Sequence, residues 1–546
     1  MIMYLYFYLI VFSLVGYGLI TCKYLKIKTF NFGTLGLIGI SSLALISFGT
    51  SLFVKHGQLF NSLILILGLI FLILNFNRIK NLKKEIIYTF VIFLFLLLFI
   101  SIGKNHDDFP YYHFSYIQLL TDYSHPYGLG RINNGFRSPS SIFFISSMFF
   151  LPKIEIYLFH ILPALIFGFA NMIFLKNIFD KENFKKEKIV SFLSIMFFLF
   201  INTFFYRLAE HGTDRSGMIL IMLSIIYLIS LINNRNLTLN KNQNSYDLMK
   251  IMLIFICFAA SIKASFLINF LFILPIIYFK QTRKIFFDLF FSPTFYFCLS
   301  LIIFITFYTF INSGCLVYPL TFTCFENLPW SFEKGQIDKV KIWFELWSKG
   351  GANPNFVVDD RLEYISGLNW LPNWIDNYFF NKVLDFIAGL LFLSLIIFFT
   401  FSKKKNLKNW KRNDIWFTYS LIVFMLVEWF LKHPTLRYGG YHLFALIIFI
   451  PMSLKLSCLK MNYDFFIKRS FILILIVVNI FLIRNLMRLN DENSLYGYNP
   501  IKNTNYKFIG GDEDFYYRYN KYIRERLENF ETIEVIGKKN FIIKDD

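Results

Sequence analysis

Charged residues are scarce in this chain: only 16% of its 546 residues are Asp, Glu, Lys or Arg, whereas soluble domains carry about 25%. Cysteine is also rare, with 6 residues, which excludes a disulfide-dense secreted scaffold. Hydrophobic residues make up 56% of the chain, too many for a disordered protein. The sequence has no P-loop, no dinucleotide-binding glycine pattern and no Cys/His metal-ligand spacing. These absences leave an integral membrane protein, with nothing that indicates nucleotide-driven chemistry.

Long apolar runs are what the chain has instead. A spanning helix needs about 20 predominantly apolar residues, so we expect an all-α polytopic membrane protein of about 12–14 spans. The runs are roughly 2–21, 33–54, 59–76, 86–103, 154–175, 189–205, 216–233, 249–262, 264–279, 285–310, 380–401, 415–431, 441–457 and 470–487. No charged segment and no small-residue cleavage site precede the first run, which predicts a span rather than a removable signal peptide. The run 140–151 is too short to cross and predicts a half-helix at the membrane surface.

Lysine and arginine gather in short connections between these runs. The basic connections are 22–32, 77–85, 176–188, 280–284, 403–412 and 460–469. All lie on the cytoplasmic side if the N-terminus is outside and 249–279 is a helical hairpin with Lys263 at its tip. The outer face then receives 104–153, 206–215, 311–379, 432–440 and the polar tail 488–546, where 530–544 predicts a small β-hairpin. The net charge of +20 therefore indicates membrane orientation rather than a nucleic-acid partner.

The expected outer loop 311–379 carries three further features. Cys315 and Cys324 could pair as a structural staple in an oxidising compartment, and free thiols are the alternative. The segment 336–349 has apolar residues at helical spacing, which predicts an interfacial helix. The tryptophans of the whole loop 311–379 could stack on sugars, or serve only as anchors at the membrane interface. They are Trp330, Trp343, Trp347, Trp370 and Trp374.

Two adjacent carboxylates, Asp107 and Asp108, directly follow the span 86–103. A carboxylate at a membrane surface could deprotonate an acceptor hydroxyl as a general base. The alternative is that Asp107 caps the helix that follows, at Pro110, and that Asp108 is simply solvated. His113 could tune such an acid or contact an acceptor.

Cationic and other titratable residues recur along the outer segments. Arg131 and Arg137 flank a glycine-bearing stretch and could bind a phosphate, although structural glycines alone would also explain that stretch. Lys263 could reach a lipid phosphate or merely snorkel to the headgroups. Arg437, beside two glycines, could clamp a pyrophosphate. The loop 206–215 adds His211 and Asp214, and Asp214 could bind a ligand or cap the next span.

The order of these pieces resembles the GT-C class of integral membrane glycosyltransferases and, more narrowly, an uncharacterised bacterial multi-pass family related to that class. The matching pieces are Asp107-Asp108 with Tyr111-Tyr112-His113, Gly128-Leu129-Gly130-Arg131 with Gly135-Phe136, Gly212-Thr213-Asp214, Ile262-Lys263-Ala264-Ser265, Tyr318-Pro319, and Pro434 with Arg437-Tyr438-Gly439. The resemblance covers about 86–455. It implies additional N-terminal spans (1–85), a GT-C-like core (86–310) with a first outer loop (104–153), a long outer loop (311–379), C-terminal spans (380–487) and a small exoplasmic tail (488–546).

The resemblance also implies an activity. A sugar would move from a polyprenyl-phosphate or polyprenyl-pyrophosphate donor to a hydroxyl of a glycan or lipid acceptor, on the periplasmic face of a bacterial inner membrane. Asp107 or Asp108 would be the catalytic base. The substrate-binding residues would be His113, Arg131, Arg137, His211, Asp214, Lys263 and Arg437. The cofactor is unknown; some members of the class use a divalent cation, which a carboxylate pair could hold.

Two other functions remain open. A surface-polysaccharide polymerase or ligase would depend on its outer arginines, here Arg131, Arg137, Arg215 and Arg437, and not on Asp107 and Asp108. A transporter or lipid flippase would place charges near the middle of the membrane and show paired broken helices.

Overall fold

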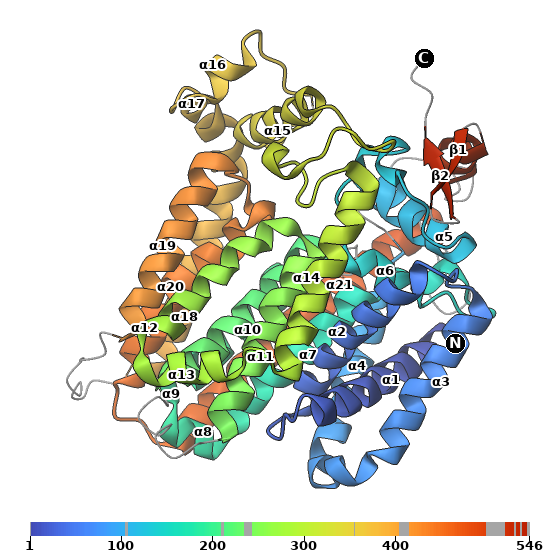
Figure 1. Ribbon diagram of the computed structural model, residues 1–546. Helices are drawn as coiled ribbons and strands as arrows, with labels where there is room; N and C mark the ends of the chain where they lie inside the picture. Colours follow the sequence, from blue (N-terminus) through green and yellow to red (C-terminus); the bar gives the residue numbers. More distant parts are fainter. Residues whose placement is uncertain are drawn as a thin grey trace.

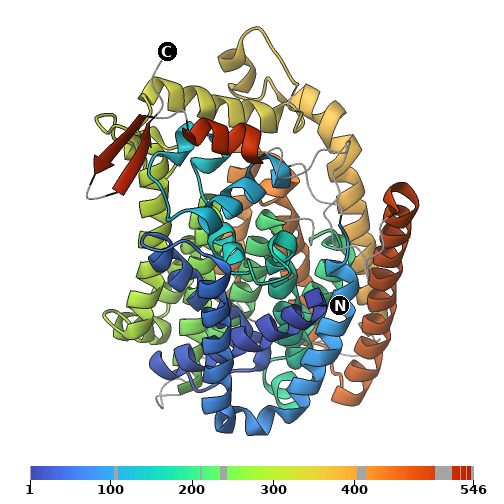
Figure 2. The same cartoon turned by 90° about the vertical axis from the view of Figure 1, so that its right-hand side faces the viewer.

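The structure, a computed structural model, describes residues 2–103, 108–208, 212–233, 243–353, 355–402, 414–497, 519–528, 531–535 and 538–542. Long helices run side by side as a bundle, and shorter helices lie across one end of it (Figures 1 and 2). This arrangement confirms an all-α polytopic membrane protein. The predicted hairpin in the tail is also present, as the antiparallel strands β1 (Glu531–Val535) and β2 (Lys538–Ile542).

Ten helices in the described part of the chain are long and apolar enough to cross a membrane, or eleven if a bent pair is counted as one span. The ten are α1 (Ile2–Tyr24), α2 (Phe32–Ser51), η5 with α7 (Ile156–Phe179), α10 (Thr213–Asn233), α11 (Gln243–Ile262), α14 (Pro293–Ser313), α17 to α18 (Leu371–Phe401), α19 (Asp414–Lys432), α20 (Gly440–Ser457) and α21 (Tyr463–Tyr496). Three further predicted runs form α3 (Gln58–Leu74), α4 (Lys83–Ile100) and α9 (Lys188–Phe204). Of these, α3 and α9 are apolar helices of 17 residues each, shorter than the ten candidate spans.

The remaining bounds belong mostly to short connecting elements; η5, α7, α17 and α18 are also given singly because they belong to the two composite spans named above. Before α11 the elements are η1 (Phe76–Leu82), η2 (Phe109–His113), α5 (Phe114–Asp122), η3 (Leu129–Arg131), η4 (Asn134–Phe136), α6 (Ser141–Ser147), η5 (Ile156–Leu158), α7 proper (Leu162–Phe179) and α8 (Lys181–Lys186). After α11 they are η7 (Ala264–Phe272), α12 (Ile273–Tyr278), α13 (Lys280–Asp288), η8 (Thr321–Thr323), α15 (Lys334–Lys349), α16 (Arg361–Ile365), α17 (Leu371–Trp374), η9 (Ile375–Val383), α18 (Leu384–Phe401), η10 (Leu436–Tyr438), η11 (Asn520–Arg524) and α23 (Glu525–Glu528).

One predicted helix boundary differs from the structure, and one predicted half-helix is present but covered by protein. The helix α14 begins at Pro293, not near 285, because the Ser292 hydroxyl accepts a hydrogen bond from the Phe295 amide (3.3 Å) and proline occupies the first helical position. The run 140–151 contains the short helix α6, which is the predicted half-helix, and other parts of the protein cover it. All its residues are buried, and the hydroxyl of its first residue, Ser141, bonds that of Ser261 in α11 (3.0 Å).

Contacts between connections separate the molecule into two faces. At one end, the backbone amides of Lys28 and Thr29 donate to Asp247 (both 2.9 Å), and the Tyr463 hydroxyl donates to the carbonyl of Phe179 (2.7 Å). We call this end, which carries the basic connections 25–31, 180–187 and 458–462, the basic face. At the other end, the amide of Gly128 donates to the carbonyl of Ile311 (2.8 Å). We call that end, which carries 122–140, 314–370 and 433–439, the site face.

The helical hairpin expected around Lys263 is present. The helix α11 ends at Ile262, and η7 with α12 returns before α13 bends away by 118°. The Tyr246 hydroxyl, at the start of α11, donates to Asp288 at the end of α13 (2.7 Å). Lys263 therefore lies at the site face, while both arms begin and end at the basic face.

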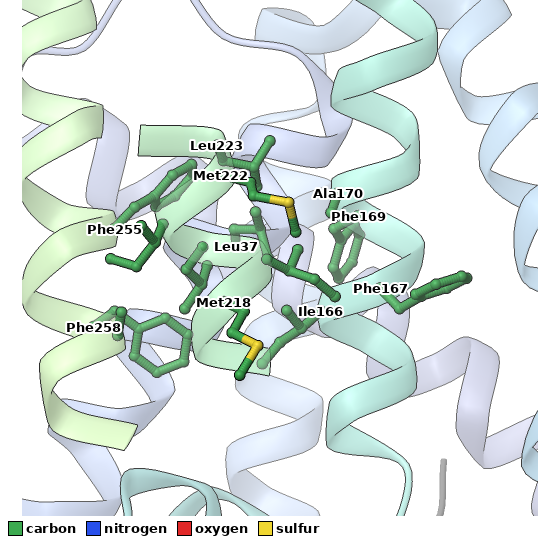
Figure 3. Close-up of a cluster of buried hydrophobic side chains, with 14 of the residues drawn as sticks. Leu37, Ile166, Phe167, Phe169, Ala170, Met218, Met222, Leu223, Phe255 and Phe258 are labelled. Carbon is green, nitrogen blue, oxygen red and sulfur yellow. The ribbon is translucent and has the colours of Figure 1, made fainter. Parts of the chain in front are cut away.

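The core lies where α2, α7, α10 and α11 meet. Leu37, Ile166, Met218 and Phe255, one from each helix, are buried there, and Figure 3 shows them packed together. Helices in a membrane associate through van der Waals packing rather than through exclusion of water, so close approach matters. Gly39 provides such an approach, because a Cβ there would overlap the carbonyl oxygen of Leu14 in α1.

Cys315 and Cys324 form a disulfide, so the pairing alternative of the sequence analysis is confirmed. The bond closes a short turn directly after α14, where the amide of Phe325 donates to the carbonyl of Gly314 (2.9 Å). Tyr318, Phe332 and Ile337 pack around it. The disulfide thus joins the end of α14 to the segment that leads into α15.

Replacing both bonded cysteines by serine (C315S/C324S) should loosen the loop 311–379. Closing a loop of about ten residues is worth about 2–3 kcal/mol of chain entropy, so we expect local opening to become about 30-fold or more frequent. The rate of limited proteolysis within the loop measures this. The variant C458S, which alters a free and half-buried cysteine, is the control; equal proteolysis rates in the two variants would refute the expectation.

Candidate functional site

Four charged residues from four segments meet at the site face. They are Asp108, just before η2, Asp214 in the first turn of α10, Lys263 at the hairpin tip, and Arg437 in η10. We call them the ionic cluster. Asp108 and Arg437 are separated by 329 positions in the sequence. The sequence analysis named all four as candidate site residues, and the structure brings them into contact.

Arg437 bridges the two carboxylates of the ionic cluster. Its Nη2 donates to Oδ2 of Asp108 (2.8 Å), and its Nε donates to Oδ2 of Asp214 (3.2 Å). The other oxygen of Asp214, Oδ1, accepts a hydrogen bond from Nζ of Lys263. The charges therefore alternate from Asp108 through Arg437 and Asp214 to Lys263, and the planar guanidinium supplies two donors at a fixed angle.

Local structure explains where each member of the ionic cluster lies. An aspartate in the first turn of α10 is favoured by the partial positive charge at a helix N-terminus. Lys263 has an extended backbone between two helical segments, which directs the chain back into the bundle. Asp108 stands at the capping position of η2, but its side chain makes no capping bond. Asp108 is therefore not simply solvated, as the alternative held, because it is paired with Arg437; the capping role that the alternative gave to Asp107 falls outside the described residues.

Exposure divides the ionic cluster into one inner and three outer members. The Asp214 side chain is 11% exposed, whereas those of Asp108, Lys263 and Arg437 are 27%, 30% and 36% exposed. Asp214 thus holds the two cations from beneath. The other three side chains are within reach of a ligand at the site face.

Aromatic rings flank the two cations. The Lys263 Nζ lies 4.4 Å from the centre of the Tyr438 ring, and the Arg437 Cζ lies 5.8 Å from the Trp347 ring centre. The two rings are 5.5 Å apart. Cations at these distances are attracted to ring faces. Trp347 comes from α15, which crosses the top of the bundle in Figure 2.

Electrostatics fixes the protonation of the loop residues around the ionic cluster. Burial lowers the pKa of Arg437, but the nearby Asp214 and Asp108 outweigh it and raise that pKa well above its ordinary value. Burial, with the two aspartates, raises the pKa of Tyr438. Burial lowers the pKa of His433 to about 4. At neutral pH the arginine is therefore charged, and the tyrosine and histidine are neutral.

Arg131 and Arg137 contact the second outer loop. Nη2 of Arg131 donates to the carbonyl of Ser331 (2.7 Å). Nη1 of Arg137 donates to the Tyr318 hydroxyl (3.1 Å), and its guanidinium lies 3.9 Å from the Phe332 ring centre. These contacts join the segment 128–137 to the disulfide-bonded turn. The structure thus gives both arginines a role in holding two loops together.

His113 is 2% exposed, and its ring packs against Tyr112 (4.3 Å) and Phe143 (4.9 Å). His113 is therefore buried at the end of η2 rather than exposed at the site face. The remaining candidates, Asp107 and His211, lie outside the residues that the structure describes. Within those residues, no three His, Cys, Asp or Glu side chains come together as metal ligands would.

The predicted substrate-binding residues included neither Trp347 nor Tyr438, although Trp347 was among the tryptophans that could stack on sugars and Tyr438 lay in a segment matched by the resemblance. Trp347 was grouped with four other tryptophans, and three of these, Trp330, Trp370 and Trp374, are buried in the structure. The helical spacing of apolar residues in 336–349 predicts a helix, but it does not predict where that helix lies relative to the charged residues of the other loops. Only the adjacency of Tyr438 to Arg437 was a signal that could have been used.

The helices and the ionic cluster define a multi-pass integral membrane protein with a four-residue ionic cluster at one end of the bundle. The chain belongs to the family described as "Domain of unknown function (DUF8201)", which matches residues 1–445. The matched region includes α1 to α3 and all four residues of the ionic cluster, and it ends within α20. No curated protein and no solved structure matches the chain.

Proposed function

We propose that the protein is a membrane glycosyltransferase that moves a sugar from a polyprenyl-phosphate or polyprenyl-pyrophosphate donor to an acceptor hydroxyl. The observation that carries the proposal is the contact between Asp108 and Arg437, with Lys263 joined to the same network through Asp214. In this network a carboxylate lies beside two cations, and the side chains of all three residues are partly exposed. That combination is what base-assisted displacement of a phosphate leaving group requires.

In the proposed reaction, a carboxylate oxygen of Asp108, or of its neighbour Asp107, takes the proton of the acceptor hydroxyl. The acceptor oxygen bonds to the anomeric carbon as the bond from that carbon to the donor phosphate breaks. The electron pair leaves with the lipid phosphate, whose charge Lys263 and Arg437 balance. An arginine partner favours the ionised form of a carboxylate, the form that a general base needs.

The site would act on the outer side of the membrane. The basic face carries the lysine-rich connections, so the positive-inside rule favours its placement in the cytoplasm. The ionic cluster would then face the periplasm of a bacterial inner membrane, where a lipid-linked donor and a glycan or lipid acceptor meet. The contacts of Arg131 and Arg137 with the loop 311–332 speak against the alternative of a polymerase or ligase that uses those arginines on substrate.

Replacing both acids by asparagine (D107N/D108N) should abolish transfer, because loss of a general base alone costs about 10²–10⁴ in rate. The assay follows release of polyprenyl phosphate from a radiolabelled polyprenyl-phosphate hexose by proteoliposomes supplied with envelope glycans and lipids. The variant D338N, which alters an exposed aspartate of α15, controls for lost charge at the same face. Wild-type activity in D107N/D108N would rule out the mechanism.

A further inference from the structure

A cavity of about 510 Å³ opens at the basic face, at the opposite end of the bundle from the ionic cluster. It is lined by Lys188, Lys460, Met461, Asn462 and Phe465. These residues come from the start of α9, the turn between α20 and α21, and the first turn of α21. None of them belongs to the proposed transferase site, so this cavity needs an explanation of its own.

Two lysines, Lys188 and Lys460, line the cavity, and an arginine of α21 contacts its lining residue Phe465. Nζ of Lys188 reaches the turn and contacts the carbonyls of Leu459 (3.4 Å) and Met461 (3.3 Å), which fixes its ammonium at the rim. Lys460 is exposed. The guanidinium of Arg469, one turn further along α21, lies 5.3 Å from the ring centre of Phe465.

The acidic residues nearby are fewer. Asp464 is exposed in the first turn of α21, and Glu187 precedes Lys188. Neither residue lines the cavity. The lining thus holds two cations and no acid, and Arg469 lies against the lining residue Phe465, a combination that favours an anionic ligand.

An exposed apolar helix face continues from the cavity along α21. Phe471, Ile472, Leu475 and Ile476 are 48%, 53%, 45% and 51% exposed, which is the exposure expected of side chains that face lipid. The rings of Phe184 and Phe466 are stacked 4.5 Å apart, and Nζ of Lys188 lies 5.4 Å from the centre of the Phe184 ring. A ligand here would find cations at the level of the headgroups and hydrocarbon-like surface directly beyond them.

We propose that this cavity binds the phosphate of an anionic membrane lipid, with its acyl chains along the exposed face of α21. Basic pockets between spans at the cytoplasmic surface suit such headgroups. Lys460 and Arg469 contact the phosphate from the exposed side, and Lys188 does so from the side of α9. A free phosphate ester would offer the same anionic group. We assign a lipid because the exposed apolar face of α21 adjoins the cavity.

Binding of dioleoyl-phosphatidylglycerol to the full-length protein in non-ionic detergent, followed by native mass spectrometry, tests this site. We expect K460A/R469A to weaken binding about 25-fold, at about fivefold for each cation. The matched control is K280A/R283A, which removes one exposed lysine and one exposed arginine from α13 at the same face. It should bind as the wild type does.

The proposal would be overturned if K460A/R469A bound like the wild type, if the control lost as much affinity, or if glycerol phosphate bound as tightly as the lipid. Both altered residues are exposed, so the fold should survive. If K460A/R469A nevertheless fails to fold, the single variant K460A must still lose about fivefold. Dioleoyl-phosphatidylcholine, whose headgroup has no net charge, should bind more weakly than phosphatidylglycerol, and equal binding would also refute the assignment.

Discussion

Replacing Asp214 by asparagine should destabilise the protein more than any other single substitution within the ionic cluster. The carboxylate accepts from both Lys263 and Arg437, so its loss leaves two cations facing each other. Breaking a buried ion pair costs about 3–5 kcal/mol, and we discount this to about 2–3 kcal/mol because both cations are about a third exposed to solvent. Guanidinium unfolding in detergent measures the change.

The double variant D214N/K263M is the matched control for that prediction. It removes one of the two opposed cations and should recover about half of the lost free energy of unfolding, because residues in direct contact are not additive. Strict additivity of D214N and K263M would show that Asp214 and Lys263 do not interact. A loss below about 1 kcal/mol in D214N would show that the bridge contributes little.

Replacing Arg437 by lysine should separate activity from stability. Lysine keeps the positive charge but has a single nitrogen, whereas Arg437 reaches Asp108 through Nη2 and Asp214 through Nε. We expect the unfolding free energy to change by less than about 1 kcal/mol, because one carboxylate contact is retained. Transfer should fall about 10²–10³-fold, the cost of losing one donor that stabilises developing charge.

The control for that prediction is R361K, an exposed arginine in α16 at the same face, which should alter neither quantity. Wild-type transfer by R437K would mean that the fork of the guanidinium is not used on substrate. If R437K unfolds as readily as D214N, the arginine is structural, and the proposed role in transfer loses its support.

The sequence predicts the arrangement of the spans well, because lipid imposes a length and a charge rule on each helix. The basic connections alone required a hairpin at Lys263, and the contact between Tyr246 and Asp288 bears this out. The boundary of α14 was missed although Ser292 and Pro293 carry an ordinary start signal. Continuous apolar sequence on both sides of the pair masked it.

The ionic cluster was only partly predictable. Residue types and their place at span ends pointed to Asp108, Asp214, Lys263 and Arg437, but no pattern in the sequence states which carboxylate contacts which cation. The same reasoning treated Arg131 and Arg137 as phosphate ligands. Their contacts with Ser331 and Tyr318 depend on a turn about 200 positions away, which local sequence does not reveal.

The joining of Asp108 to Arg437 has a consequence for how the protein is made. The arginine follows α19, so a ribosome must complete most of the chain before the aspartate can meet it. The segment around Tyr519, whose hydroxyl donates to Asp122 (2.8 Å), arrives later still. A truncated or stalled product that ends before Arg437 therefore lacks this ion pair, and we expect quality-control proteases to distinguish it from the finished molecule.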